Sequence, residues 1–146
     1  MPEQIILGSD HAGYKLKEGI KEHLVKKGYK IDDLGVYSEE NIDYPSYGFK
    51  AAKRVAEKNS KGILFCGSGI GMCMVANRIK GIRAAVARDE NDARLSREHN
   101  DSNILCLGGR ITDLAKAKKI VDVWLKTEFS KEERHRRRVK ETDSLK

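Results

Sequence analysis

Short apolar segments alternate with amphipathic segments along the whole chain. The apolar segments cover residues 4–9, 29–34, 62–66, 82–87 and 103–107. After the first of them, Leu16, Ile20 and Leu24 recur every fourth position among lysines and glutamates. An apolar run of this length is typical of a buried strand, and the periodic spacing is typical of a helix that buries one face. The pattern therefore predicts five strands that alternate with helices.

Several helix ends carry a local signal. Asp89 and Thr112 stand just before periodic segments and are expected to cap the fourth and fifth helices through their side-chain oxygens. Gly28 follows the first periodic segment and is suited to its C-terminal cap. The sequence Ser130-Lys131-Glu132-Glu133 has the form of a capping box and predicts a further, basic helix over about 130–140.

This alternation predicts an α/β fold. We expect a three-layer αβα sandwich of the Rossmann-like type, with a five-stranded parallel sheet, helices on both faces and an added C-terminal helix. Right-handed crossovers favour the flavodoxin-like strand order 2-1-3-4-5, with a switch point between strands 1 and 3. Ligands bind beyond the carboxyl ends of the strands at such a point. No linker interrupts residues 1–146, which are expected to form a single domain.

Composition narrows the classes of function. No apolar run reaches the roughly 18 residues of a membrane span, so no membrane partner is expected. The first residues, Met1-Pro2-Glu3-Gln4, lack a basic region and a cleavage site, which predicts a cytoplasmic protein. Three cysteines at irregular spacing argue against a disulfide framework. A net charge of +7 fits a plain basic surface, a phosphorylated small molecule or a nucleic acid.

The third apolar segment runs straight into a glycine loop, Cys66-Gly67-Ser68-Gly69-Ile70-Gly71. Free N–H groups at the start of a helix favour an anion, and glycine lets the backbone approach it closely. The spacing is neither that of a dinucleotide fingerprint nor that of a P-loop. The loop therefore predicts an anion or substrate site of another kind.

Cys66 has two interpretations. It is either a buried core thiol, as free cysteines commonly are, or a chemical group. A phosphatase nucleophile would need an arginine six residues later, where this chain has Met72, and a redox pair would need a CxxC motif. The chemical role that remains is a general base that removes a carbon-bound proton while the loop N–H groups stabilise an oxyanion.

The basic segment 131–140 leaves three interpretations open. Arg134 and Arg138 stand four residues apart on one helix face, where they can grip one phosphate. A nucleic-acid surface is the second, although stacking aromatics are missing and glutamates interrupt the charge. A solvated helix is the third. His11 and His99 follow the ends of expected elements, and no Cys/His spacing matches a metal site.

Six segments of this chain occur together in a known family. They are Gly8-Ser9-Asp10-His11-Ala12-Gly13, Asp43-Tyr44-Pro45, Cys66-Gly67-Ser68-Gly69-Ile70-Gly71-Met72, Glu98-His99-Asn100, Leu107-Gly108-Gly109-Arg110 and the paired arginines of the tail. In this order they resemble the ribose-5-phosphate isomerase B family, which includes galactose-6-phosphate and allose-6-phosphate isomerases. The resemblance covers nearly the whole chain.

The resemblance implies an aldose–ketose isomerase without cofactor or metal. It would interconvert D-ribose 5-phosphate and D-ribulose 5-phosphate through a cis-enediolate, in the non-oxidative branch of the pentose phosphate pathway. By matching position, Cys66 would be the base and His99 would help to open the furanose ring. Gly67, Ser68, Gly69 and Gly71 would hold the developing enediolate oxygen through backbone N–H groups. Relatives without the cysteine carry an acid at the position of Met72, so the two features agree here. An allose- or galactose-6-phosphate isomerase is the nearest alternative, and a non-catalytic nucleotide- or RNA-binding module is a distant one.

The resemblance also implies the substrate contacts and the assembly. The implied contacts are Asp10, His11, Tyr44, Gly67, Gly69, Ile70, Gly71, Asn100, Arg110, Arg134 and Arg138. Of these, His11 and the three arginines would receive the phosphate. The family pattern is a homodimer or a dimer of dimers with shared active sites, in which the C-terminal segment reaches the partner subunit. The expected ligand is a small phosphorylated sugar, with no nucleic acid.

Overall fold

The computed structural model describes residues 3–145, and Met1, Pro2 and Lys146 lie outside the described residues. Strands and helices alternate along the chain as expected. In chain order they are β1 (Gln4–Ser9), α1 (Tyr14–Lys26), β2 (Lys30–Asp33), α2 (Tyr44–Lys58), β3 (Lys61–Cys66), α3 (Ile70–Ala76), β4 (Ala84–Val86), α4 (Glu90–Glu98), β5 (Ile104–Gly108), α5 (Leu114–Lys126) and α6 (Glu133–Ser144).

The five strands form one parallel sheet in the order β2-β1-β3-β5-β4. The predicted α/β class and the switch point between β1 and β3 are confirmed. The predicted order 2-1-3-4-5 is wrong in its last two strands. All five residues of β5 are buried, whereas the three residues of β4 are only half-buried. The strand with the longer buried run therefore lies inside the sheet, and β4 forms its edge.

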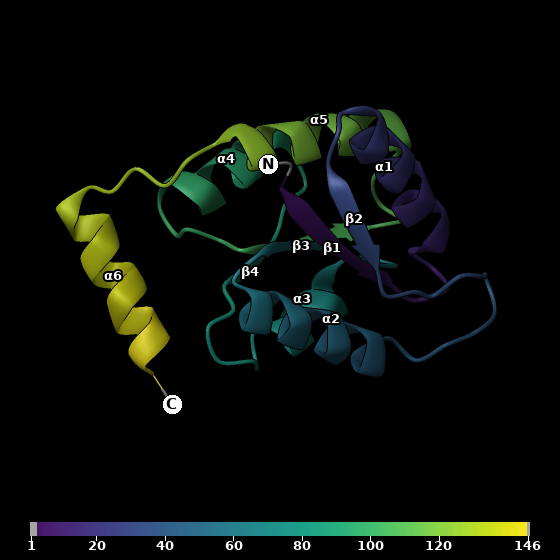
Figure 1. Ribbon diagram of the computed structural model, residues 1–146, viewed down its shortest axis with the longest axis horizontal. Coiled ribbons are helices and arrows are strands. Elements are labelled where there is room, and N and C mark those ends of the chain that lie inside the picture. The colour runs from purple at the N-terminus through teal and green to yellow at the C-terminus, as the bar shows by residue number, and fades with distance from the viewer. Residues whose placement is uncertain (1–2, 146) are drawn as a thin grey trace.

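Helices cover both faces of the sheet (Figure 1). α1, α4 and α5 lie on one face, and α2 and α3 lie on the other. Successive strand residues point to opposite faces, so Ile5 and Leu7 pack in one core with Trp124, while Ile6 packs in the other with Met72. Within residues 3–145, no helix combines the length and the apolar character that a membrane span requires.

The expected helix caps are confirmed in one case and wrong in another. Asp89 caps α4, and its Oδ1 accepts a hydrogen bond of 2.7 Å from the backbone N–H of Asp92. The cap of α5 is Asp113 rather than Thr112, because Asp113 Oδ1 accepts from the N–H of Lys116 at 2.8 Å. Thr112 is instead buried in the turn that follows β5.

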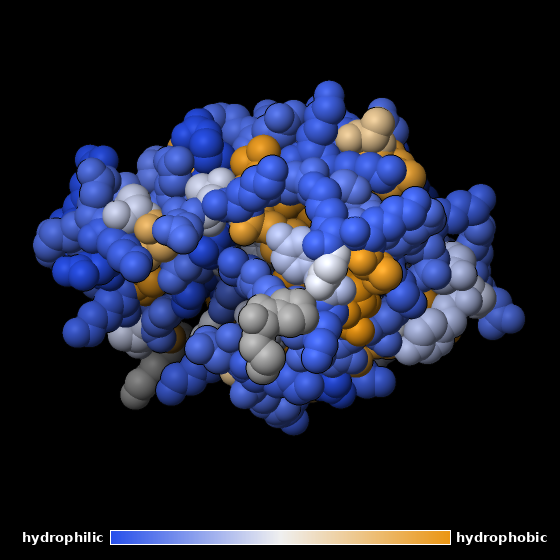
Figure 2. Space-filling model, turned by 45° about the horizontal axis from the view of Figure 1, so that its top comes forward, coloured by the Kyte–Doolittle hydropathy of each residue, from blue (hydrophilic) through white to orange (hydrophobic). Residues whose placement is uncertain are grey.

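The C-terminal helix differs in its bounds from the expected range 130–140. α6 covers Glu133–Ser144, and the predicted capping box does not form. Ser130 precedes the helix, and its Oγ lies 2.6 Å from Nδ1 of His135 instead. α6 stands beside the three-layer body in Figure 1, and its surface in Figure 2 is largely hydrophilic. Of its described side chains only His135 is buried, so α6 is held to the body by few contacts.

Candidate active site

Three loops meet at the carboxyl ends of β1, β3 and β5. The backbone N–H of Asp10 donates to the carbonyl of Phe65 at 3.1 Å, and the N–H of Gly109 donates to that of Cys66 at 2.7 Å. The N–H of Arg110 donates to the carbonyl of Gly67 at 3.0 Å. One continuous surface therefore lies at the switch point. It is formed by the segment 8–13 at the end of β1, the glycine loop after β3 and the turn 108–110 at the end of β5.

Glycines allow these loops to pack backbone against backbone. A Cβ atom on Gly13 would lie 2.4 Å from the carbonyl carbon of Phe65, and one on Gly109 would lie 2.4 Å from the carbonyl oxygen of Ala12. Such distances are shorter than any real Cβ contact, and backbone cannot move aside as a flexible side chain can. Gly13 and Gly109 are thus required by the close approach of the loops.

Cys66 occupies the last position of β3 and is 4% exposed. Its Sγ accepts a hydrogen bond of 3.2 Å from the backbone N–H of Gly69, whose φ of +83° suits glycine. The Oγ of Ser68 accepts from the N–H of Ile70 at 3.2 Å. Helix geometry leaves the N–H of Gly71, in the first turn of α3, without an intrahelical acceptor. The thiol therefore lies beside a row of backbone donors.

Four side chains from other loops surround this row of donors. Oδ1 of Asp10, a buried side chain, accepts from the N–H of Gly13 at 3.0 Å, and Nδ1 of His11 lies 3.1 Å from the N–H of Ile42. A Cβ on Gly71 would lie 2.6 Å from the Tyr44 ring, and one on Gly67 would lie 3.4 Å from Nη1 of Arg110. Asp10, His11, Tyr44 and Arg110 thus gather with Cys66 as one group, which we call the thiol group.

The remaining candidate residues form a second group at the other end of the sheet. His99 and Asn100 follow α4 and precede β5, whose first residue pairs with Gly62, whereas its last pairs with Cys66. β5 is about 13 Å long at the usual rise per residue. We call His99, Asn100, Arg134 and Arg138 the histidine–arginine group. Within one chain the two groups lie at opposite ends of β5.

A cavity of about 950 Å³ separates α6 from the body of the molecule, and Asn100 and Arg138 both line it. Nη1 of Arg83, on the body, lies 2.9 Å from Oδ2 of Asp143 near the end of α6. Near the start of α6, the ring of His135 lies against that of His99, with the ring centroids 4.4 Å apart. The helix therefore carries Arg138 along the cavity, between its contacts at His135 and Asp143.

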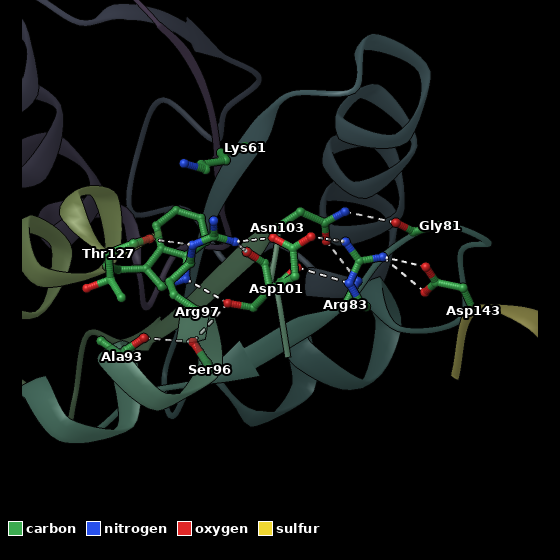
Figure 3. A network of polar contacts seen from close by, with 12 residues as sticks. Lys61, Gly81, Arg83, Ala93, Ser96, Arg97, Asp101, Asn103, Thr127 and Asp143 are labelled. Atoms are coloured by element: carbon green, nitrogen blue, oxygen red, sulfur yellow. Dashed lines mark hydrogen bonds and ion pairs between the residues drawn. The ribbon is translucent and has the colours of Figure 1, made fainter. Parts of the chain in front are cut away.

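Two arginines hold the turn that follows His99 and Asn100 (Figure 3). Nη1 of Arg97 donates to Oδ1 of Asp101 at 2.9 Å, and Nε donates to the carbonyl of Thr127 at 3.1 Å. Nε of Arg83 donates to the carbonyl of Asp101 at 2.9 Å, and its backbone N–H donates to Oδ1 of Asn103 at 2.8 Å. This network fixes the segment that carries His99 and Asn100. No sequence pattern predicted a role for Arg97 or Arg83, because their partners include residues that are distant along the chain.

Another thiol, Cys73 in α3, has surroundings that differ from those of Cys66. A hydrogen bond from Cys106 lowers the pKa of Cys73 to about 7, against the opposing effect of burial. Burial and the same contact raise the pKa of Cys106 well above its ordinary value. Neither thiol is bonded to the loops at the strand ends. Among residues 3–145, no three His, Cys, Asp or Glu side chains are grouped so as to hold a metal ion.

The fold and the thiol group define a class of protein. A doubly wound sheet with a thiol and a glycine loop at its switch point is an α/β protein that binds a small ligand at the strand ends. The sequence model of the family described as Ribose/Galactose Isomerase matches residues 5–142, and the chain belongs to this family. The resemblance drawn from the six segments is therefore confirmed.

Similar proteins cover nearly the whole chain. Ribose-5-phosphate isomerase B of Escherichia coli K12 is 44% identical over 138 residues, which are 94% of this chain and 92% of that protein. A structure of the Clostridium thermocellum ribose-5-phosphate isomerase B is 47% identical, with a TM-score of 0.93 and coverage of 96% and 95%. A structure of the Mycoplasma genitalium enzyme with bound ribulose-5-phosphate is 41% identical, with a TM-score of 0.93 and coverage of 98% and 95%.

Proposed function

We propose that this protein is a ribose-5-phosphate isomerase, which interconverts D-ribose 5-phosphate and D-ribulose 5-phosphate. The observation that carries the proposal is the position of Cys66, a thiol at the switch point beside the donors of a glycine loop, in a chain of the ribose/galactose isomerase family. Its similarity to a protein solved with ribulose-5-phosphate supports the same ligand here. The reaction belongs to the non-oxidative branch of the pentose phosphate pathway.

Proton transfer between C1 and C2 follows from this arrangement. The Cys66 thiolate takes the proton from C2 of the open-chain aldose, and the electron pair forms the C1–C2 double bond of a cis-enediolate. Backbone N–H groups of Gly67, Gly69 and Gly71 stabilise the negative oxygen that had been the C1 carbonyl. The Ser68 hydroxyl holds the oxygen on C2 while the proton of that oxygen moves to the oxygen on C1. The thiol proton exchanges with solvent water over repeated turnovers. The thiol then gives a proton to C1, and the ketone remains at C2.

Opening of the furanose ring is assigned to His99 of the histidine–arginine group. Only the open chain has the carbonyl that the chemistry needs, and His99 moves the proton that opens the furanose. Because one chain holds His99 and Cys66 at opposite ends of β5, a complete site takes them from two subunits. The protein is then a homodimer, alone or as half of a dimer of dimers, and two-fold symmetry gives it two equal sites. The exposed surface of α6 supports this, since a partner can cover it.

Sugar and phosphate contacts complete the site. Asp10 and Asn100 bind sugar hydroxyls, while Tyr44 and Ile70 line the pocket. The phosphate is received by His11 and by the arginines Arg110, Arg134 and Arg138. The whole chain acts as one isomerase domain without a cofactor. Three free thiols suit the reducing cytoplasm, where phosphorylated sugars are retained.

Substitution of Arg138 by alanine is expected to raise KM for the phosphorylated sugar about 10-fold or more, because a charge-assisted bond to phosphate is lost. Steady-state kinetics on ribose 5-phosphate measure this change. Arg137→Ala is the matched control, because Arg137 is on the same helix but pairs with Glu133 at 2.6 Å. An equal rise of KM in both variants would mean that α6 contributes general charge rather than a phosphate ligand.

The identity of the sugar is tested by rates measured side by side on ribose 5-phosphate, allose 6-phosphate and galactose 6-phosphate. The proposal predicts the highest kcat/KM on ribose 5-phosphate. Each hexose phosphate has one more carbon between the reacting centre and the phosphate, so the depth of the pocket decides the preference. A higher kcat/KM on either hexose phosphate would assign the protein to the other branch of its family.

A further inference from the structure

We propose that His135 is a positioning residue, which holds the imidazole of His99 in the orientation required for ring opening. The inference rests on the proposed function, because it assigns a second residue to the step given to His99. It names a residue for which neither its position in the sequence nor its neighbours along the chain gave a role.

His135 is the one described side chain of α6 that is buried, at 4% exposed. Its ring lies against the ring of His99, with centroids 4.4 Å apart and planes inclined by 33°. A helix that otherwise exposes its side chains would be expected to anchor itself through an apolar residue. Here a polar, titratable ring occupies that place, and the group that it contacts is the candidate ring-opening histidine.

Several contacts together fix the rings of His99 and His135. The backbone N–H of Ser130 donates to the carbonyl of Glu98 at 3.1 Å, which ties the segment before α6 to the residue before His99. The Oγ of Ser130 lies 2.6 Å from Nδ1 of His135, and Oε2 of Glu132 lies 3.2 Å from the same nitrogen. His99 is therefore held through its neighbour in the backbone and through its ring.

The contact leaves the nitrogens of His99 available to a ligand. Among residues 3–145, no group hydrogen-bonds either ring nitrogen of His99, whose backbone N–H donates to the carbonyl of Leu95 at 2.9 Å. Packing against His135 thus restrains the ring by shape alone. A restrained ring with free nitrogens is what a proton transfer to a sugar ring oxygen needs.

The charges around His135 favour its neutral form. Burial is the largest influence on its pKa, which it lowers, and the charges of His99 and Arg134 lower it further. Glu132 raises the pKa and Arg138 lowers it, both by smaller amounts. A neutral His135 packs against His99 without repelling it when His99 carries a proton during the reaction.

The test uses two reactions that differ only in ring opening. Ribose 5-phosphate must open its furanose before C2 can lose its proton. Ribulose 5-phosphate has phosphate on O5 and forms no furanose ring, so exchange of its C1 proton with D₂O needs the base alone. His135→Ala is expected to lower kcat on ribose 5-phosphate about 10- to 100-fold through misplacement of His99. Exchange on ribulose 5-phosphate and both KM values are expected to change by less than about twofold, because Cys66 lies at the other end of β5 and the Arg83–Asp143 ion pair still holds α6 to the body.

Two further variants sharpen the result. His135→Phe keeps a flat ring against His99 and is expected to recover most of the lost kcat. His23→Ala is the control, because His23 is a half-buried histidine far from His99, and its Nε2 lies 2.8 Å from Oδ1 of Asp122 between α1 and α5. It is expected to leave both reactions unchanged.

Other outcomes overturn the inference. Equal losses in isomerisation and exchange, or a rise of KM for both sugars, would mean that His135 merely anchors α6. An unchanged kcat in His135→Ala would remove any role in the reaction. A wild-type protein that neither isomerises nor exchanges either sugar would instead contradict the proposed function itself.

Discussion

Substitution of Cys66 by alanine is expected to lower kcat for isomerisation about 10³-fold, because a positioned base contributes on this order to a proton transfer. KM is expected to change little, since the contacts given to the phosphate and the hydroxyls lie on other residues. Initial rates at saturating ribose 5-phosphate measure the loss. Cys66 is at the end of a buried strand, so thermal unfolding of the variant should be followed alongside the rates.

The neighbouring thiol provides the control for this prediction. Cys73 has a pKa of about 7, which would favour it as the base if thiolate content alone decided the matter. It lies in α3, half-buried against the side chain of Asn77 and the carbonyl of Ala84, away from the loops at the strand ends. Cys73→Ala is therefore expected to keep kcat within about twofold of wild type. The reverse result, with Cys73→Ala inactive and Cys66→Ala active, would place the base on α3.

Mixed dimers are expected to restore activity to two inactive chains. A Cys66→Ala chain and a His99→Ala chain, purified together through two different tags, should have about half the wild-type kcat per dimer. One of the two shared sites then holds an intact Cys66 and an intact His99, while the other holds neither. The measurement is the rate of the purified heterodimer on ribose 5-phosphate.

The reciprocal mixture gives the opposite result. A wild-type chain paired with a chain that carries both Cys66→Ala and His99→Ala should be nearly inactive, because each shared site then lacks one of the two residues. If each chain instead built its own site, this mixture would keep half the activity and the first mixture would have none. The two mixtures together therefore decide where His99 acts.

Elements with a strong local pattern could be predicted from the sequence. The runs that became β1 and β3 could be placed because burial on both faces of the sheet makes them continuously apolar. The periodic residues of α1 could be placed because burial of one helix face imposes their spacing. The order of β4 and β5 was not predicted, since chain order favours neighbours while the buried length of β5 favours the interior. The cap at Asp113 was missed because Thr112, one residue earlier, fits the same rule.

The candidate site likewise has a part that could be predicted from local motifs and a part that could not. Its thiol group follows from motifs in which a strand, a tight turn and a helix start occur within a few residues, as in the glycine loop after Cys66. The role proposed for His135 has no such motif, because it depends on a contact between α6 and the end of α4. The separation of His99 from Cys66 likewise depends on which end of β5 each one adjoins. Contacts between distant segments are set by packing, which single-residue patterns do not report.

Incorporation of solvent deuterium tests the central claim most directly. Wild-type protein should equilibrate ribose 5-phosphate in D₂O, and over many turnovers NMR should show deuterium at C2 of the aldose and at C1 of the ketose. Cys66→Ala should show neither within the same time. Interconversion of the two sugars without deuterium at either carbon, even over many turnovers, would contradict transfer through a base that exchanges its proton with water. Full exchange by Cys66→Ala would contradict the assignment of that base to Cys66.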